Sequence, residues 1–204
     1  MDREQLQALY EQEEYYWGKQ PNRLAKRVFE FISKDKAKGL KLVDLGAGEG
    51  RDSVYFAEQG LDVLAVDISS AGLMKTLRLA EQKNVSVSVQ EADLNSLCLE
   101  NSIDILYSIG ALQYLVPHNR FKQFQHFKER TVSGGLHVLF AFIEHPDIEI
   151  APDWGRNEYL YQRDELQEYY RDWKVLDCDE WIFDCHSSGI PHQHAANVLI
   201  ARKP

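Results

Sequence analysis

LVDLGAGEGRDS, residues 42–53, places three glycines within five residues and an aspartate two positions before the first of them. A short apolar run precedes the glycines and a segment with helical spacing follows them, so the loop joins a buried strand to a helix. In parallel α/β sheets, ligands bind beyond the carboxyl ends of the strands, and glycine lets a ligand approach the main chain closely. The pattern predicts a nucleotide-like ligand at this loop. The alternative is a tight turn that needs glycine only for its own conformation.

The rest of the chain continues the alternation of strand and helix. We expect strands at 41–45, 61–67, 85–90, 103–108 and 135–143, and helices at 2–16, 22–33, 51–59, 70–83 and 119–130. A helix at 163–173 and two strands at 174–183 and 194–201 follow, with a turn around Ser188-Gly189 and Pro191. Alternation implies parallel strands with right-handed crossovers, whereas two adjacent strands imply a hairpin. The sequence therefore predicts an α/β fold with a mostly parallel sheet, helices on both faces and an antiparallel C-terminal hairpin.

Composition narrows the class of protein. The chain has 204 residues, 44% of them hydrophobic, which suits one domain, and a formal net charge of −9, which disfavours a nucleic-acid partner. Its three cysteines suit a reducing compartment. The acidic N-terminus is unlike a signal peptide, and no apolar run reaches the roughly 20 residues of a membrane helix. We expect a cytoplasmic protein, monomeric or homodimeric, that acts on a small molecule and not at a membrane.

The details of the glycine loop distinguish between cofactors. A dinucleotide loop reads G-x-G-x-x-G, but here the spacing is G-x-G-x-G and Arg51 stands in the place of the third glycine. Asp44 before the loop repels a pyrophosphate and attracts an ammonium group. S-adenosylmethionine carries an α-ammonium and no phosphate, so these residues favour it over NAD.

Acidic residues also follow the next two predicted strands. Asp67 ends the strand at 61–67, where a carboxylate accepts hydrogen bonds from ribose hydroxyls. Asp93 and the main chain of Leu94 follow the strand at 85–90, within reach of an adenine ring. The alternatives are a helix N-cap for Asp67 and a plain turn for Asp93.

These strand ends, in this order, resemble those of the class I S-adenosylmethionine-dependent methyltransferases. The segments EYYWGKQPNRL, DELQEYYRDWKVLD and NVLIARK, with Asp184-Cys185-His186, resemble the tellurite methyltransferase (tellurite-resistance) family over nearly the whole chain. The resemblance implies a seven-stranded mixed sheet and an N-terminal segment that closes over the cofactor. It also implies methyl transfer to a soft nucleophile, either a tellurite- or selenite-like oxyanion or a thiol.

The resemblance also implies roles for single residues. It divides the chain into a helical lid at 1–38 and a core at 39–204 of one methyltransferase domain. Carried over by position, the residues that hold the methionine end of the cofactor are Asp44, Gly46, Ala47, Gly48 and Arg51. Asp67 and Ile68 hold the ribose, Asp93 and Leu94 hold the adenine, and Ser108 and Ile109 lie under the sulfonium. The lid residues are Tyr16, Trp17 and Arg23.

The predicted acceptor pocket differs from the family pattern. Its candidate wall is Tyr114, Trp154, Arg156 and His186, with His186 as the catalytic residue that orients or deprotonates the acceptor. The alternatives are packing for the two aromatic residues, a surface ion pair for Arg156 and a surface position for His186. The segment after the strand at 135–143 is acidic and aromatic, and His192-Gln193-His194 stands where the family has arginine. Less fixed positive charge binds an oxyanion less well.

Other interpretations stay open. Cys185, His186, His192 and His194 are a ligand set that suits zinc, although the sequence has no C-x-x-C pair to support it and we predict no metal. A methyltransferase of another small metabolite, with a nitrogen or oxygen acceptor, is an alternative. A NAD-dependent oxidoreductase and a non-catalytic cofactor-binding protein are further alternatives.

Overall fold

The chain forms a seven-stranded sheet. The computed structural model describes residues 3–152, 154–186 and 189–204. The strands are β1 (Lys41–Leu45), β2 (Asp62–Asp67), β3 (Ser88–Glu91), β4 (Ile103–Ser108), β5 (Thr131–Phe142), β6 (Lys174–Cys185) and β7 (His192–Arg202). Their order is β3-β2-β1-β4-β5-β7-β6; β1 to β5 pair in parallel, and β7 is antiparallel to both β5 and β6. The predicted fold class is confirmed. In the predicted β6–β7 turn, Ser188 lies outside the described residues.

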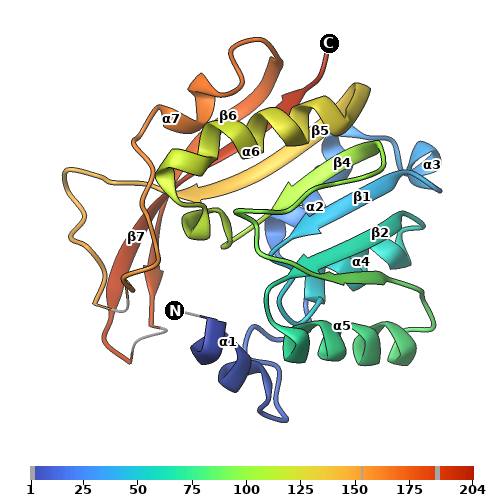
Figure 1. Cartoon of the computed structure of the whole chain (residues 1–204), viewed down its shortest axis with the longest axis horizontal. Coiled ribbons are helices and arrows are strands. Elements are labelled where there is room, and N and C mark those ends of the chain that lie inside the picture. The colour runs from blue at the N-terminus through green and yellow to red at the C-terminus, as the bar shows by residue number, and fades with distance from the viewer. Residues whose placement is uncertain (1–2, 153, 187–188) are drawn as a thin grey trace.

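Helices cover both faces of the sheet (Figure 1). They are α1 (Arg3–Tyr10), α2 (Arg23–Phe31), α3 (Lys34–Ala37), α4 (Arg51–Glu58), α5 (Ser70–Gln82), the 3₁₀ turn η1 (Leu112–Tyr114), α6 (Pro117–Arg130) and α7 (Glu165–Glu168). Apolar residues of α2, α4 and α5 share one hydrophobic cluster, and those of η1, α6 and α7 share another. The strands separate the two clusters, because successive side chains point to opposite faces. In β1, for example, Leu42 belongs to the first cluster and Val43 to the second.

The first helix is shorter than the sequence predicts. We expected a helix over 2–16, but α1 ends at Tyr10 and turns lead to Gly18. Three glutamates, at positions 11, 13 and 14, would crowd the C-terminal end of a longer helix, where the helix dipole disfavours negative charge. The turns instead bring Tyr16 and Trp17 against the glycine loop.

The helix expected at 163–173 is also shorter. Only Glu165–Glu168 is α-helical, and the hydrogen bonds from Tyr170 N to Gln167 O and from Trp173 N to Tyr170 O continue it as tight turns. The apolar spacing is the same in both forms. Leu166, Tyr170 and Trp173 are buried in the cluster that covers this face of the sheet.

The order of the strands fixes where a ligand can bind. β2 and β3 lie on one side of β1, whereas β4 and β5 lie on its other side. The crossovers on the two sides of β1 and β4 therefore diverge, and a crevice forms at the carboxyl ends of these strands. None of the helices in the described ranges combines the length and the apolarity needed to cross a membrane.

Candidate active site

A cavity of about 870 Å³ lies at the carboxyl ends of the parallel strands. The glycine loop and the N-terminal segment bound one part of it, and the distal parts of β5, β6 and β7 bound the other. Most of the residues that the sequence singles out line this one cavity: Tyr16, Trp17, Arg23, Asp44, Gly46, Ala47, Gly48, Arg51, Asp67, Ile68, Asp93, Leu94, Ile109, Tyr114 and Trp154.

Three candidate residues lie outside the described lining. Ser108 is fully buried, and its hydroxyl donates to the carbonyl of Leu45 at 2.9 Å, which ties the end of β4 to the end of β1. Arg156 and His186 are exposed. The functional roles of these three residues, like those of the residues in the cavity, stay predictions.

The glycine loop is shaped by its own packing as well as by the cavity. Gly46 has φ +75°, and a Cβ placed there would stand 2.1 Å from the Cβ of Ala111. Gly48 has φ +55°, and its N–H donates to Asp67 Oδ2 at 2.8 Å. Both glycines are thus required by the turn itself, as well as by the approach of a ligand.

Four buried carboxyl groups line the cavity at and beside this loop, those of Asp44, Glu49, Asp52 and Asp67, and two of them are the predicted cofactor contacts Asp44 and Asp67. Burial raises the pKa of Asp44 to about 7, and the nearby carboxyl of Asp52 adds to the rise, while a hydrogen bond from the Ser53 hydroxyl at 2.6 Å opposes it. Burial also raises the pKa of Asp67, although the main-chain N–H groups of Ser69 and Gly48 stabilise its charged form. Carboxylates kept from water are ready to bind a cationic or hydrogen-bond-donating ligand, because such a ligand replaces the lost solvation.

The position predicted for adenine is built by a side-chain turn. Asp93 Oδ1 accepts from the main chain and the side chain of Asn95, at 2.8 and 2.9 Å. The amide of Asn95 in turn contacts the carbonyl of Tyr114 and the N–H of Val116. Asp93 therefore connects the end of β3 to the segment after β4.

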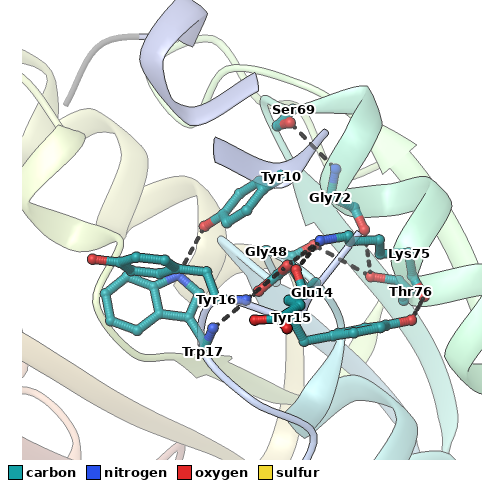
Figure 2. Close-up of polar contacts among 11 residues, drawn as sticks. Tyr10, Glu14, Tyr15, Tyr16, Trp17, Gly48, Ser69, Gly72, Lys75 and Thr76 are labelled. Carbon is teal, nitrogen blue, oxygen red and sulfur yellow. Dashed lines mark hydrogen bonds and ion pairs between the residues drawn. The ribbon is translucent and has the colours of Figure 1, made fainter. Parts of the chain in front are cut away.

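A buried ion pair holds the N-terminal segment over the glycine loop (Figure 2). Glu49 accepts from the main-chain N–H groups of Tyr16 at 3.1 Å and of Trp17 at 3.0 Å. Lys75 of α5 pairs with the same carboxylate at 2.7 Å, and it also donates to the carbonyl of Glu14. We call Glu49, Lys75 and the main chain of residues 14–17 the lid clamp.

The sequence analysis missed the lid clamp. Glu49 lies inside the glycine loop, and Lys75 lies among the buried residues Leu73, Thr76 and Leu79 of α5. A lysine within an otherwise buried stripe was the available signal, because a buried cation needs an anionic partner. A further contact, from Trp17 Nε1 to the Tyr10 hydroxyl at 3.0 Å, joins the lid to α1, and burial raises the pKa of that hydroxyl.

The other part of the cavity is aromatic. We call it the aromatic end, and the part at residues 44–52, Asp67 and the lid the glycine-loop end. Arg23 lies over the ring of Trp181, 3.5 Å from its centroid. His194 is buried against Phe142 and Phe183. The rings of the aromatic end come from β5, β6 and the loop after β5: Phe140, Phe142, Trp154, Trp181 and Phe183.

Two polar groups at the aromatic end were also missed. Glu158 accepts from the Tyr114 hydroxyl at 2.9 Å and from the N–H of Gly155, and burial beside this carboxylate raises the pKa of Tyr114. Gln113 donates to the carbonyl of Gly110, but its buried Oε1 has no hydrogen-bond partner within the described part of the chain. Buried acceptors without a partner are rare in proteins, and Gln113 also lines the cavity, so a ligand donor is a candidate partner for this oxygen once the side chain turns toward the cavity.

A comparison with protein families gives a direct match. The family described as "Tellurite resistance protein TehB" matches residues 9–192. The chain belongs to the TehB family. The resemblance stated from the sequence is confirmed, and the match includes the lid clamp, the glycine loop and the aromatic end.

Relatives of known name agree with this assignment. The chain is 26% identical over 148 residues to a protein of Haemophilus influenzae named "Probable S-adenosyl-L-methionine-dependent methyltransferase TehB", covering 72% of this chain and 51% of the relative. It is 25% identical over 167 residues to "Hemagglutinin 1" of Eikenella corrodens, covering 80% and 55%. The chain thus spans about half the length of the curated relatives that it matches.

A solved structure supports the fold. The crystal structure of TehB from Haemophilus influenzae superposes with a TM-score of 0.78 at 24% identity, covering 88% of this chain and 61% of that one. At this identity the similarity establishes a common fold. The fold is that of the class I methyltransferases.

Proposed function

We propose that this chain is an S-adenosylmethionine-dependent methyltransferase that acts on a soft nucleophile, with a thiol preferred over a bare oxyanion. The observation that carries the proposal is the pair of buried carboxyl groups, Asp44 and Asp67, facing a cavity at the carboxyl ends of β1 and β2. The relative's name includes the same cofactor and reaction class.

The residues present fit this cofactor. Asp44 meets the α-ammonium and Asp67 the ribose hydroxyls, and each carboxylate gains a further donor in place of the water that burial excludes. The unpartnered Oε1 of Gln113 offers an acceptor to a further donor of the bound molecules. NAD fits less well, because its pyrophosphate would lie beside the carboxylates of the glycine-loop end.

Charge at the aromatic end favours a thiol over an oxyanion. Arg23 is the arginine of the described lining at that end, and it lies over Trp181. Glu158 adds a negative charge in the wall, which also contains the rings of the aromatic end and the side chains of Asn157, Ile182, Cys185 and His194. An oxyanion would exchange its hydration for a carboxylate and apolar surface, whereas a thiol carrying an apolar body gains from burial there.

The chemistry requires positioning more than proton transfer. The cofactor supplies a methyl group on a sulfonium, and the chain must align the acceptor with it and exclude water. Positioning of this kind contributes up to about 7–11 kcal/mol. The lid clamp and the aromatic rings close the two ends of the cavity, as exclusion of water requires. His186 as an orienting base, Tyr114, Trp154 and Arg156 as acceptor contacts, and residues 1–38 as the lid of a single domain remain part of this proposal.

The decisive experiment has two steps. Calorimetric titration with S-adenosylhomocysteine and with NAD identifies the cofactor. Labelled S-adenosylmethionine with a panel of thiols, selenite, tellurite, small amines and alcohols then identifies the acceptor. We expect binding of S-adenosylhomocysteine and label transfer to a thiol. Binding of NAD without binding of S-adenosylhomocysteine would refute the proposal, and transfer only to tellurite or to an amine would refute the thiol preference.

Asp67→Ala tests the ribose contact. We expect affinity for S-adenosylhomocysteine to fall by about 1–3 kcal/mol, the range for loss of a buried acceptor, in calorimetric titration. Asp62→Ala is the matched control, since Asp62 is an exposed carboxylate at the other end of β2, outside the described lining, and its loss should leave affinity unchanged. Equal affinity of the Asp67 variant and the unchanged chain would contradict the assignment.

The proposal also covers the cellular location and the partners of the chain. We propose a cytoplasmic location, where free cysteines such as Cys98, Cys178 and Cys185 stay reduced. A small-molecule acceptor, no nucleic-acid partner, and a monomer or homodimer complete the proposal.

A further inference from the structure

A cluster of metal-ligand side chains lies at the distal end of the β6–β7 hairpin. Cys185 on β6 is the cross-strand partner of His192 on β7, and His194 follows two residues later on the same face. The sulfur and the imidazole nitrogens all lie within 4.8 Å of one another. Strand pairing alone therefore brings the three side chains together.

The two imidazole rings converge through the same atom. Nε2 of His192 and Nε2 of His194 are 3.0 Å apart. Nδ1 of His192 lies 2.7 Å from the carbonyl of Ile190, which can only accept, so this nitrogen carries the proton. In the neutral ring the lone pair is then on Nε2, which accepts the hydrogen carried by Nε2 of His194, and a metal ion would take the place of that hydrogen. Histidines that bind metals are held in the same way, with the second ring nitrogen donating to a carbonyl.

We propose that Cys185, His192 and His194 bind a borderline divalent metal ion such as zinc at the rim of the cavity. In tetrahedral zinc sites, ligand nitrogens stand roughly 3.3 Å apart and a sulfur roughly 3.5 Å from each, given the usual bond lengths. The cluster reaches these separations by small side-chain rotations. One thiolate and two imidazoles are a set that zinc prefers over magnesium or calcium.

Three protein ligands leave a fourth position for another molecule. Cys185 and His194 both line the cavity, at the aromatic end, so the fourth position lies beside the proposed acceptor. A metal ion held by these three residues would favour the thiolate form of a thiol bound there, with the thiol proton passing to solvent. That thiolate would be the nucleophile for the methyl group, forming one S–C bond as the S–C bond of the sulfonium breaks, so that the cofactor would end as a neutral thioether. This consequence rests on the proposed function; the metal site itself does not.

Cobalt is the probe that tests the site directly. Full-length, tag-free protein is treated with a chelator, dialysed and titrated with Co²⁺, and then with Zn²⁺ in competition. We expect one equivalent to bind with a thiolate-to-cobalt absorption band, and zinc to displace it. Cys185→Ser should abolish the band and weaken binding about a hundredfold or more, and His194→Ala should weaken binding at least tenfold.

Matched variants serve as controls. Cys178→Ser changes another cysteine of β6, and His118→Ala changes an exposed histidine of α6, so both should bind cobalt as the unchanged chain does. Absence of stoichiometric binding in the unchanged chain, or an equal loss in the control variants, overturns the proposal.

The titration with S-adenosylhomocysteine, made on the same samples without metal, separates this proposal from the proposed function. Normal cofactor binding without cobalt binding refutes the metal site alone. Cobalt binding without cofactor binding refutes the proposed function and supports the site.

Discussion

The two ends of the cavity are built in different ways. The glycine-loop end depends on main-chain hydrogen bonds, on buried carboxyl groups in or next to strand ends that the fold fixes, and on the lid clamp, which adds Lys75 of α5 and the main chain of residues 14–17. The aromatic end depends on side chains from three strands and a long loop, and rings make up most of its surface. The first arrangement specifies one kind of ligand by polar contacts, whereas the second selects by shape and apolar area. The difference explains why the cofactor can be inferred from the chain more directly than the acceptor.

Removal of the Lys75 cation from the lid clamp is the change expected to destabilise the glycine-loop end most. The side chains of Lys75 and Glu49 are 5% and 1% exposed, so Lys75→Met leaves a buried carboxylate without its ion pair. We expect a loss of about 3–5 kcal/mol in the free energy of unfolding, measured by urea denaturation. The double variant with Glu49→Gln should recover part of the loss. No recovery would show that the pair is not coupled.

A methyl group at Gly46 tests whether the loop depends on packing or on backbone freedom alone. Gly46→Ala combines a positive φ with the 2.1 Å approach to Ala111, whereas Gly39→Ala, at φ +80°, has nothing within 4 Å. We expect Gly39→Ala to cost about 1–2 kcal/mol and Gly46→Ala about 1–3 kcal/mol more, by thermal or urea unfolding. Equal costs would mean that the loop and Ala111 separate freely.

The pH dependence of cofactor binding follows from Asp44. Its pKa is about 7 without ligand, above the usual 3.8, and an ammonium group needs the charged form. Affinity for S-adenosylhomocysteine should be full above pH 7 and fall about tenfold per pH unit below it, with proton release on binding, as measured by calorimetry in several buffers. Asp44→Asn should bind weakly at every pH, and a flat profile in the unchanged chain would exclude this role.

Through Asp44, folding stability changes with pH in the opposite direction to cofactor affinity. The folded-state pKa of Asp44 lies above the unfolded value, so the folded chain binds more protons between about pH 4 and pH 7. The contribution of this group to the free energy of unfolding therefore falls as the pH rises through that range.

The smallest expected effect concerns the aromatic end. Trp154 packs on Phe142 and its indole N–H donates to the carbonyl of Glu158. Trp154→Leu should raise the KM for the acceptor about three- to tenfold, the scale of one aromatic contact, and leave affinity for S-adenosylhomocysteine within twofold. A matching loss of cofactor affinity would show that the two ends are not independent.

The sequence predicted those parts of the fold that depend on local pattern. Strand ends at Leu45, Asp67 and Ser108 were expected and are where the structure has them, because apolar runs and glycines mark them locally. The end of α1 was wrong by several residues. That boundary depends on Glu49, more than 30 positions later, which binds the main chain of Tyr16 and Trp17.

The site was predictable to a different degree at each end. Residues at the glycine-loop end lie next to strand ends, so their order in the chain is also their order in the cavity. At the aromatic end, Trp181 and Phe183 reach the cavity because the hairpin pairs with β5 through β7, and Glu158 reaches it through a loop. Such contacts depend on register and loop path, which local patterns do not specify. The same register unites Cys185 with the two histidines.

The buried amide oxygen of Gln113 has a consequence for discrimination among ligands. Its solvation was given up when the chain folded, and no protein group in the described residues restores it. A molecule whose N–H or O–H reaches this oxygen gains about 1–3 kcal/mol of binding free energy over an isostere without that hydrogen, because the isostere leaves the oxygen without a partner. One side chain thus gives the site a means to reject close analogues that fit equally well by shape.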